Sequence, residues 1–312
     1  MKKLIYLAAI AAIFGACTSS KEIPVASNVT IEIDARPVID EFAAWQKGEL
    51  DMYEGSSLGI YCFIYDMDGN LVEKGEGMLD DYSISSWTLE GMQDGEYQIV
   101  AVSYASADEY SAYEINGSSR LETLEIYQNF YQSFYTNWSC LGMAFNKITI
   151  GEDDVIKISM EPACAYVEVS YRNMINISDY RVDGVSFWMK ANRFLKFKNN
   201  MPYYTNELGV DTYYVSSVDM PSGTYSGIRE TFFLLPSDDM YYQASYNMGE
   251  EVLLEFGKAS TSIVAGEQYE FVVDCPNQTI SVQTRATSAS SSEYVGKNTG
   301  TLNVSEYYGI TK

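Results

Sequence analysis

The chain is a succession of short segments in which apolar and polar residues alternate, and it has no long amphipathic helical pattern. Alternation with a period of two places successive side chains on opposite faces of a β-strand. Bulky flat side chains also pack well on a pleated surface, and the sequence contains 27 Tyr and 13 Phe. The sequence therefore predicts an all-β protein, with its clearest strands at residues 29–33, 59–65, 96–104, 155–160 and 165–171.

The 312 residues exceed the length of one typical domain, so two domains are expected. Short strands bounded by turns are typical of antiparallel β-sandwiches. The turn at residues 151–154 (GEDD) separates two such series of strands. We therefore predict two consecutive antiparallel β-sandwiches, at residues 28–154 and 155–277, followed by a Ser/Thr-rich tail at 278–312 with a terminal strand at 301–310.

The N-terminal residues have the layout of a secretory signal. Two lysines precede an apolar run at residues 4–14, and Gly-Ala then leads to Cys17. The apolar run is about half of the roughly 20 residues that a membrane-spanning helix requires. We predict a signal peptide at residues 1–16 and a short polar tether at 17–27.

The Gly-Ala-Cys sequence that ends at Cys17 resembles the lipobox of bacterial lipoproteins. In that motif signal peptidase cuts before the Cys, whose thiol then carries diacylglycerol, with palmitate as a typical acyl chain. The resemblance implies attachment to outer-membrane lipid through Cys17, and it leaves open which face of that membrane carries the protein. The alternative is an ordinary signal peptide with a chance Cys at this position.

The chain is strongly acidic, with a net charge of −23 at pH 7, and it contains no His. An acidic surface repels nucleic-acid phosphates, so no nucleic-acid partner is expected. The absence of His excludes Ser-His-Asp and Cys-His catalysis and HExxH zinc sites. Carboxylate pairs suited to glycoside hydrolysis arise by chance among 43 acidic residues, and no segment singles one out. We therefore expect no catalytic residues, no cofactor and no enzymatic activity.

Four cysteines follow Cys17, and an exported chain can use them for two disulfides. Pairing Cys62 with Cys140, and Cys164 with Cys275, keeps each bond within one predicted sandwich. The alternative is that these cysteines are small buried hydrophobic residues. Their wide spacing contains no CxxC sequence, so it predicts neither a metal site nor a redox motif.

An acidic turn at residues 66–70 (DMDGN) invites comparison with a calcium-binding loop. An EF-hand loop has Gly at its sixth position and Glu at its twelfth, where this chain has Leu71 and Gly77. Asp, Gly and Asn are also the residues that tight turns favour. The sequence therefore predicts a β-turn here and no metal site.

Residues 127–138 (YQNFYQSFYTNW) combine aromatic rings with amides. Rings that stack on sugar faces beside amide hydrogen bonds can bind carbohydrate. The candidate glycan-binding residues of this segment are Tyr127, Tyr131, Tyr135 and Trp138. The alternative is a structural role, because aromatic residues are common in β-cores and in the loops that cover them.

Three segments resemble the fimbrillin superfamily of Bacteroidales, which includes anchor-like fimbrial subunits. Residues 59–71 (GIYCFIYDMDGNL) are similar to its hydrophobic strand and D-x-G turn, and residues 89–104 (LEGMQDGEYQIVAVSY) to its later G-x-Y strand. Residues 158–169 (ISMEPACAYVEV) look like the entry to its second domain. The likeness spans most of residues 28–275 and implies two transthyretin-like sandwiches with a role in surface fibres or adhesion.

Stalk subunits of that family mature by cleavage after a basic residue. Arg36 is followed by Pro37, which blocks most trypsin-like cleavage, so the resemblance fits an anchor or accessory subunit better. It implies a non-catalytic outer-membrane lipoprotein acting in fibre assembly or adhesion, with other fimbrial subunits as partners by strand exchange. The terminal strand either takes part in that exchange or completes its own sandwich. The alternative function is a glycan-binding lipoprotein of a polysaccharide uptake system.

Overall fold

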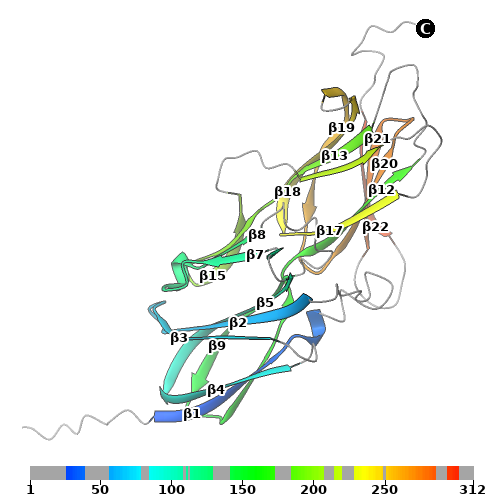
Figure 1. Ribbon diagram of the computed structural model, residues 1–312. Coiled ribbons are helices and arrows are strands. Elements are labelled where there is room, and N and C mark those ends of the chain that lie inside the picture. The colour runs from blue at the N-terminus through cyan, green and yellow to red at the C-terminus, as the bar shows by residue number, and fades with distance from the viewer. Residues whose placement is uncertain are drawn as a thin grey trace, which may run out of the picture.

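In the residues that it describes, the computed structural model consists almost entirely of β-strands, which form five sheets (Figure 1). Three sheets build the first part of the molecule and two build the second, and the two parts follow one another along its length. The structure describes residues 26–38, 56–78, 84–107, 110–111, 113–128, 141–172, 184–206, 214–219, 228–248, 251–285 and 294–301.

The first sandwich packs an outer sheet on a middle sheet. The outer sheet has the order β10-β1-β4, with β1 (Ala26–Asp34), β4 (Ile84–Gln93) and β10 (Val155–Ser159). The middle sheet has the order β11-β9-β5-β2-β3, with β2 (Ser56–Tyr65), β3 (Leu71–Met78), β5 (Gly95–Ala107), β9 (Leu141–Ile150) and β11 (Glu161–Pro162). The short strand β6 (Tyr110–Ser111) pairs with the end of β5.

A third sheet, which we call the bridging sheet, contains strands from both halves of the chain. Its order is β15-β14-β8-β7, with β7 (Tyr113–Asn116) and β8 (Glu125–Gln128) from the first half and β14 (Phe194–Lys198) and β15 (Met201–Thr205) from the second. A single turn of 3-10 helix, η1 (Leu121–Thr123), lies between β7 and β8. The β8–β14 pairing aligns Tyr127 with Phe194 and Ile126 with Leu195.

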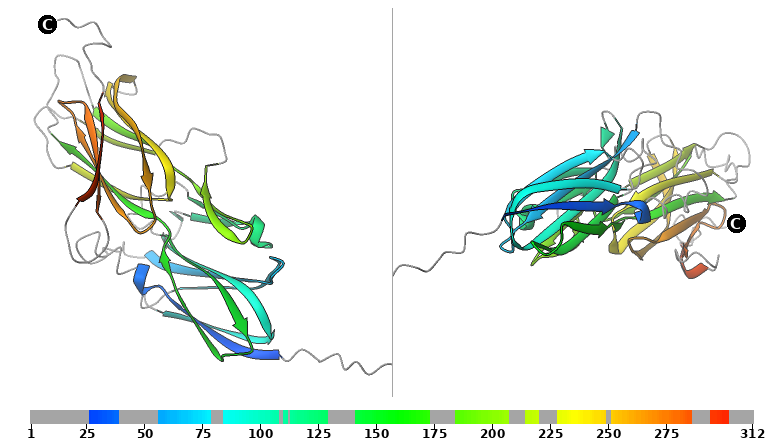
Figure 2. Two further views of the ribbon diagram at one scale, coloured as in Figure 1. Left: turned by 180° about the vertical axis from the view of Figure 1, so that it is seen from behind. Right: turned by 90° about the horizontal axis from the view of Figure 1, so that it is seen from below.

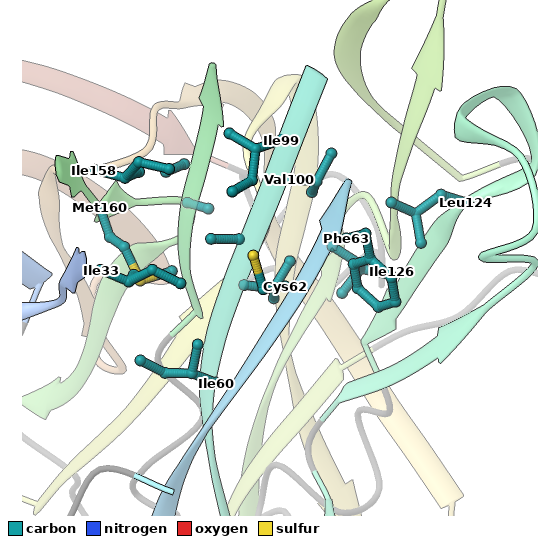
Figure 3. Close-up of a cluster of buried hydrophobic side chains, with 14 of the residues drawn as sticks. Ile33, Ile60, Cys62, Phe63, Ile99, Val100, Leu124, Ile126, Ile158 and Met160 are labelled. Carbon is teal, nitrogen blue, oxygen red and sulfur yellow. The ribbon is translucent and has the colours of Figure 1, made fainter. Parts of the chain in front are cut away.

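The bridging sheet covers the face of the middle sheet that the outer sheet leaves open. Figure 3 shows Ile33 and Ile158 on one side of β2 and β5, and Leu124 and Ile126 of the bridging region on the other. Successive side chains of the middle sheet therefore alternate between two apolar interiors, which explains why its central strand β5 is buried on both faces. The first core has three layers, and its third layer is completed by the second half of the chain.

The second sandwich packs a five-stranded sheet on a four-stranded sheet. The five-stranded sheet has the order β17-β12-β20-β21-β22, with β12 (Ala165–Arg172), β17 (Ile228–Leu234), β20 (Gln268–Asp274), β21 (Thr279–Arg285) and β22 (Tyr294–Thr301). The other, which we call the Trp188 sheet, has the order β16-β13-β18-β19, with β13 (Gly184–Lys190), β16 (Tyr214–Asp219), β18 (Ser237–Met248) and β19 (Glu251–Ile263). Buried rings join the two sheets, with the centroids of Phe187 and Phe271 5.2 Å apart.

The all-β architecture of two sandwiches confirms the predicted fold class. Two strand pairs are parallel, β1 with β10 and β12 with β20, whereas we had predicted antiparallel strands throughout. In each case the partners are separated by many intervening strands, and so long a connection lets the returning strand run parallel to the first. The strands of the second sandwich begin with β12, because β10 and β11 pair with β1 and β9 of the first half.

Phe197 of β14 tests the contribution of the second half to the first core. Its side chain is 2% exposed, and its ring centroid lies 5.5 Å from that of Phe145 on β9. We expect Phe197→Ala to lower the free energy of unfolding by about 3–5 kcal/mol, because the truncation leaves a cavity between two layers. Urea denaturation followed by circular dichroism measures this change.

Met201→Ala is the matched control, because Met201 lies in the same β14–β15 hairpin and is 64% exposed. Its effect should stay within about 0.5 kcal/mol, as for most surface substitutions. Equal effects of the two substitutions would show that β14 does not contribute to the first core.

Candidate interaction surfaces

The predicted glycan-binding segment begins on the bridging sheet, and Tyr127 is the one of its four candidate residues that the structure describes. Tyr131, Tyr135 and Trp138 lie outside the described residues. The guanidinium carbon of Arg193 lies 4.6 Å from the centroid of the Tyr127 ring, and the Phe194 ring lies 5.0 Å from it at a tilt of 36°. Tyr127 therefore helps to hold β8 against β14, and a role of the whole segment in glycan binding stays a prediction.

Gln128 and Arg193 form a buried polar contact where the two halves meet. The Gln128 side chain is fully buried, its amide donates to the Phe233 carbonyl at 2.7 Å, and its Oε1 accepts from the Leu235 N–H at 3.3 Å. The Gln128 N–H donates to the Arg193 carbonyl at 2.8 Å, and the Arg193 guanidinium donates to the Gln128 carbonyl at 3.4 Å. Because buried polar groups without partners are costly, this network specifies one alignment of the halves.

The acidic turn after β2 is a tight turn that uses its own carboxylate. Asp66 Oδ1 accepts hydrogen bonds from the N–H groups of Asp68 at 3.0 Å and Asn70 at 2.8 Å, and Gly69 has a left-handed φ of 78°. The hydrogen bond from the Asn70 side chain, more than any other contact, holds the pKa of Asp66 below its ordinary value. The predicted β-turn is confirmed. Within the described residues, no three His, Cys, Asp or Glu side chains are grouped so as to hold a metal ion.

The turn has a second role, because it positions the segment that leads into β8. The Leu121 N–H donates to the Gly69 carbonyl at 2.8 Å, and the Leu71 N–H donates to the Ser119 carbonyl at 3.1 Å. The Tyr65 hydroxyl adds a hydrogen bond to the Ser118 carbonyl at 3.0 Å. The D-x-G turn of the first sandwich is thereby connected to the bridging sheet.

The three described cysteines of the fold, namely Cys62, Cys164 and Cys275, are buried and form no disulfide, and Cys140 lies outside the described residues. Cys164 precedes β12, where its carbonyl accepts from the Gly266 N–H, whereas Cys275 follows β20 and donates its N–H to Arg172. Since β12 and β20 are parallel and in register over their whole length, the two thiols lie at opposite ends of this strand pair. The predicted Cys164–Cys275 disulfide is therefore wrong, and the description of these residues as small buried hydrophobes fits them better.

The C-terminal tail contributes a strand to its own second sandwich. β22 pairs antiparallel with β21, from Tyr294 opposite Arg285 to Thr301 opposite Thr279. It forms the outer edge of the five-stranded sheet and also lies beside β19 of the facing sheet. Figure 2 shows β22 in dark red along the flank of the second sandwich. The strand that we predicted at 301–310 begins where β22 ends, and residues 302–312 lie outside the described part of the chain.

The outward face of the Trp188 sheet carries aromatic and amide side chains that the sequence analysis did not single out. Trp188 lies on β13, and Tyr241 and Gln243 lie on β18 next to it. The sequence feature that could have revealed this face is the alternation of these residues with core residues such as Phe187 and Tyr242. We had looked for clustered aromatic residues, whereas a sheet brings together residues that are far apart in the chain.

The predicted lipid-carrying Cys17 and the signal peptide lie outside the described residues. No helix in the part of the chain that the structure describes is long and apolar enough to cross a membrane.

No protein-family model and no curated protein matches the chain. Among solved structures, the fimbrial anchor protein Mfa2 from Porphyromonas gingivalis is similar with a TM-score of 0.46 and 14% sequence identity, covering 84% of this chain and 97% of that chain. A fimbrial assembly protein from Parabacteroides distasonis is similar with a TM-score of 0.44 and 12% identity, covering 86% of this chain and 99% of that chain.

The free thiols lead to a chemical prediction. Burial raises the pKa of Cys62 to about 12 and is the main cause that raises the pKa of Cys275 to about 12. Because the thiolate is the reactive form, we expect iodoacetamide at pH 8 to label both at least about 100-fold more slowly in the native protein than in urea. Mass spectrometry of tryptic peptides from a time course measures the two rates. Rapid native labelling, or a peptide mass that joins either cysteine to another, would contradict this prediction.

Proposed function

We propose that the protein is a non-catalytic lipoprotein of the outer membrane and acts as a fimbrial anchor or accessory subunit in fibre assembly or adhesion. The observation that carries the proposal is the position of β22 at the edge of the five-stranded sheet, with the lipobox-like Cys17 at the other end of the chain. A terminal strand at a sheet edge is the element that two subunits can exchange through main-chain hydrogen bonds.

The composition of β22 supports an exchangeable strand. Its sequence YVGKNTGT contains two glycines and only two apolar residues, Tyr294 and Val295. Glycine weakens a strand because it adds no side-chain packing and loses much conformational entropy on ordering. The β21 strand that it covers is well anchored, with Ile280 fully buried and Val282 3% exposed. Removal of β22 therefore leaves an intact acceptor edge.

The placement of the two ends also supports an anchor. β1 begins at the end of the molecule that is remote from the second sandwich (Figures 1 and 2). A lipid on Cys17 would thus hold the first sandwich next to the membrane and leave β22 and the second sandwich directed away from it. This is the orientation in which an anchor can contact a fibre.

The second candidate function is a glycan-binding lipoprotein of a polysaccharide uptake system. The observation that favours it is the aromatic and amide-rich outward face of the Trp188 sheet, which contains Trp188, Tyr241 and Gln243. Tyr127 gives it less support, because its ring contacts Arg193 and Phe194.

Lipid attachment is tested by Cys17→Ala. We expect the variant to be released from membranes or to accumulate as uncleaved precursor, because no thiol is left to carry lipid. Cell fractionation followed by immunoblotting, with metabolic labelling by a palmitate analogue, measures the outcome. Cys62→Ala serves as the control and should keep both lipid and location. A Cys17→Ala protein that is processed normally and stays in salt-washed membranes would contradict lipid anchoring.

Strand exchange is tested by deleting residues 286–312 and adding them back as a peptide. We expect the truncated protein to melt within about 5 °C of the full chain, because its two cores remain, while it no longer enters fibres or binds a fimbrial subunit. The peptide should bind the truncated protein, as measured by fluorescence anisotropy.

A peptide with Asn298→Pro and Thr299→Pro is the control. N–H groups point alternately to either side of a strand, so one of these two prolines must remove a donor that faces β21. Unfolding of the second sandwich on truncation would identify β22 as a permanent strand and would end the exchange proposal.

A further inference from the structure

We propose that the outward face of the Trp188 sheet binds an uncharged glycan, with Trp188 and Tyr241 as the stacking surface and Gln243, Ser245 and Asn247 as the groups that hold these two side chains in position. None of these residues belongs to the segment 127–138 that the sequence suggested for glycan binding. The inference does not depend on fibre assembly, and it names a different face and a chemical class of ligand.

The register of β13 and β18 defines this face. Phe187, Met189, Tyr242 and Ala244 are fully buried in the second core, so the residues that alternate with them point outward. Trp188 is paired with Gln243, and Lys190 with Tyr241. The two aromatic side chains are thus diagonal neighbours on adjacent strands, with backbones about 7–8 Å apart. Both residues are half-buried, so each is partly accessible at the surface.

Hydrogen bonds hold the aromatic side chains in place. The Trp188 indole Nε1 donates to Ser245 Oγ at 2.9 Å, and Ser245 Oγ donates to Asn247 Oδ1 at 2.9 Å. The Tyr241 hydroxyl donates to Gln243 Oε1 at 2.6 Å. Ser245 is fully buried and Gln243 is 9% exposed, so both partners are fixed by the sheet. A ring held by a fixed partner loses little side-chain entropy when a ligand packs on it.

The charged groups of the face are Lys190, opposite Tyr241, and the pair of Glu255 with Lys258, and they favour an uncharged ligand. Glu255 is the acidic residue next to Gln243, and its Oε1 accepts from the Gln243 amide at 3.1 Å while its Oε2 pairs with Lys258 at 2.5 Å. The chain as a whole has a net charge of −23, whereas the charges of this ion pair cancel. A polyanion is repelled by the overall charge and finds no unbalanced cation in this pair.

The apolar content of the face distinguishes a glycan from a protein partner. Among the described residues, the large hydrophobic side chains that are strongly exposed are Met67, Val72, Val155, Met201, Val252 and Val264. Of these, Val252 alone belongs to the outward face, at the end of β19 opposite Asn247. Large contiguous apolar patches are the surface feature that marks many protein-interaction sites, and the described part of this face does not show one. Two amphipathic rings among hydroxyls and amides suit a sugar, which has apolar C–H faces and many hydroxyl groups.

Affinity electrophoresis tests the proposal on the chain from residue 18 onward. Dextran, soluble starch, yeast mannan and galactan are cast separately into native gels, with polygalacturonate as the acidic counterpart. We expect at least one neutral polysaccharide to retard the protein and polygalacturonate not to do so. Trp188→Ala and Tyr241→Ala should each weaken the retardation by about tenfold or more, as truncations of central aromatic contacts do. Trp188→Phe should retain part of it.

Tyr203→Ala on β15 is the matched control, because Tyr203 is a half-buried tyrosine of a different sheet. It should bind as the parent does, and the melting temperature of each variant establishes that it is folded. The proposal is overturned if none of the four neutral polysaccharides retards the parent protein, if polygalacturonate alone does, or if folded Tyr241→Ala binds as Tyr203→Ala does. Truncation of residues 286–312 should leave the retardation unchanged, which separates this test from that of strand exchange.

Discussion

The pairing of β8 with β14 is the contact on which the rest of the structure depends. It joins a strand of the first half to a strand of the second and so completes the bridging sheet. That sheet covers the face of the middle sheet to which Phe63 and Phe145 belong, and Leu195 and Phe197 belong to the same core. Without the pairing this face would meet water, at a cost of about 25 cal/mol for each Å² of apolar surface. The two sandwiches are thus consecutive in the sequence and share one of their cores.

A purely apolar joint between the halves would leave their alignment loosely specified, because hydrophobic contact has no direction. Gln128 and Arg193 supply the direction. The Gln128 side chain donates a hydrogen bond to the Phe233 carbonyl and accepts one from the Leu235 N–H. A shift of one residue along either strand would therefore leave buried polar groups without partners. Under the proposed anchor role, a fixed joint keeps the C-terminal strand at a constant orientation to the lipid.

Local patterns were enough to predict the fold class. The alternating segments 96–104 and 165–171 are strands β5 and β12, and the turn chemistry of 66–70 gives the expected turn. The connections between distant strands were beyond such patterns. β8 is four residues long and lies outside the segments in which alternation predicted the clearest strands. Its pairing with β14 follows from packing on the middle sheet, not from its own sequence. The outward face of the Trp188 sheet was missed for a related reason, because register alone brings Trp188 to Gln243.

The edges of the sheets bear on which of them can receive a strand from another subunit. β3 is an edge that carries Glu73, Lys74 and Glu76, and charged residues oppose pairing with a further strand. β15 is an edge that contains Pro202, which has no N–H to donate, and β11 is only two residues long. β21 has neither a run of charged residues nor a proline, since the one charged residue of its sequence TISVQTR lies at its end. An uncovered β21 would therefore be the least protected of these edges, and the chain covers it with its own C-terminal strand. Under the proposed strand exchange, this glycine-rich strand is the cover that a partner's strand would replace.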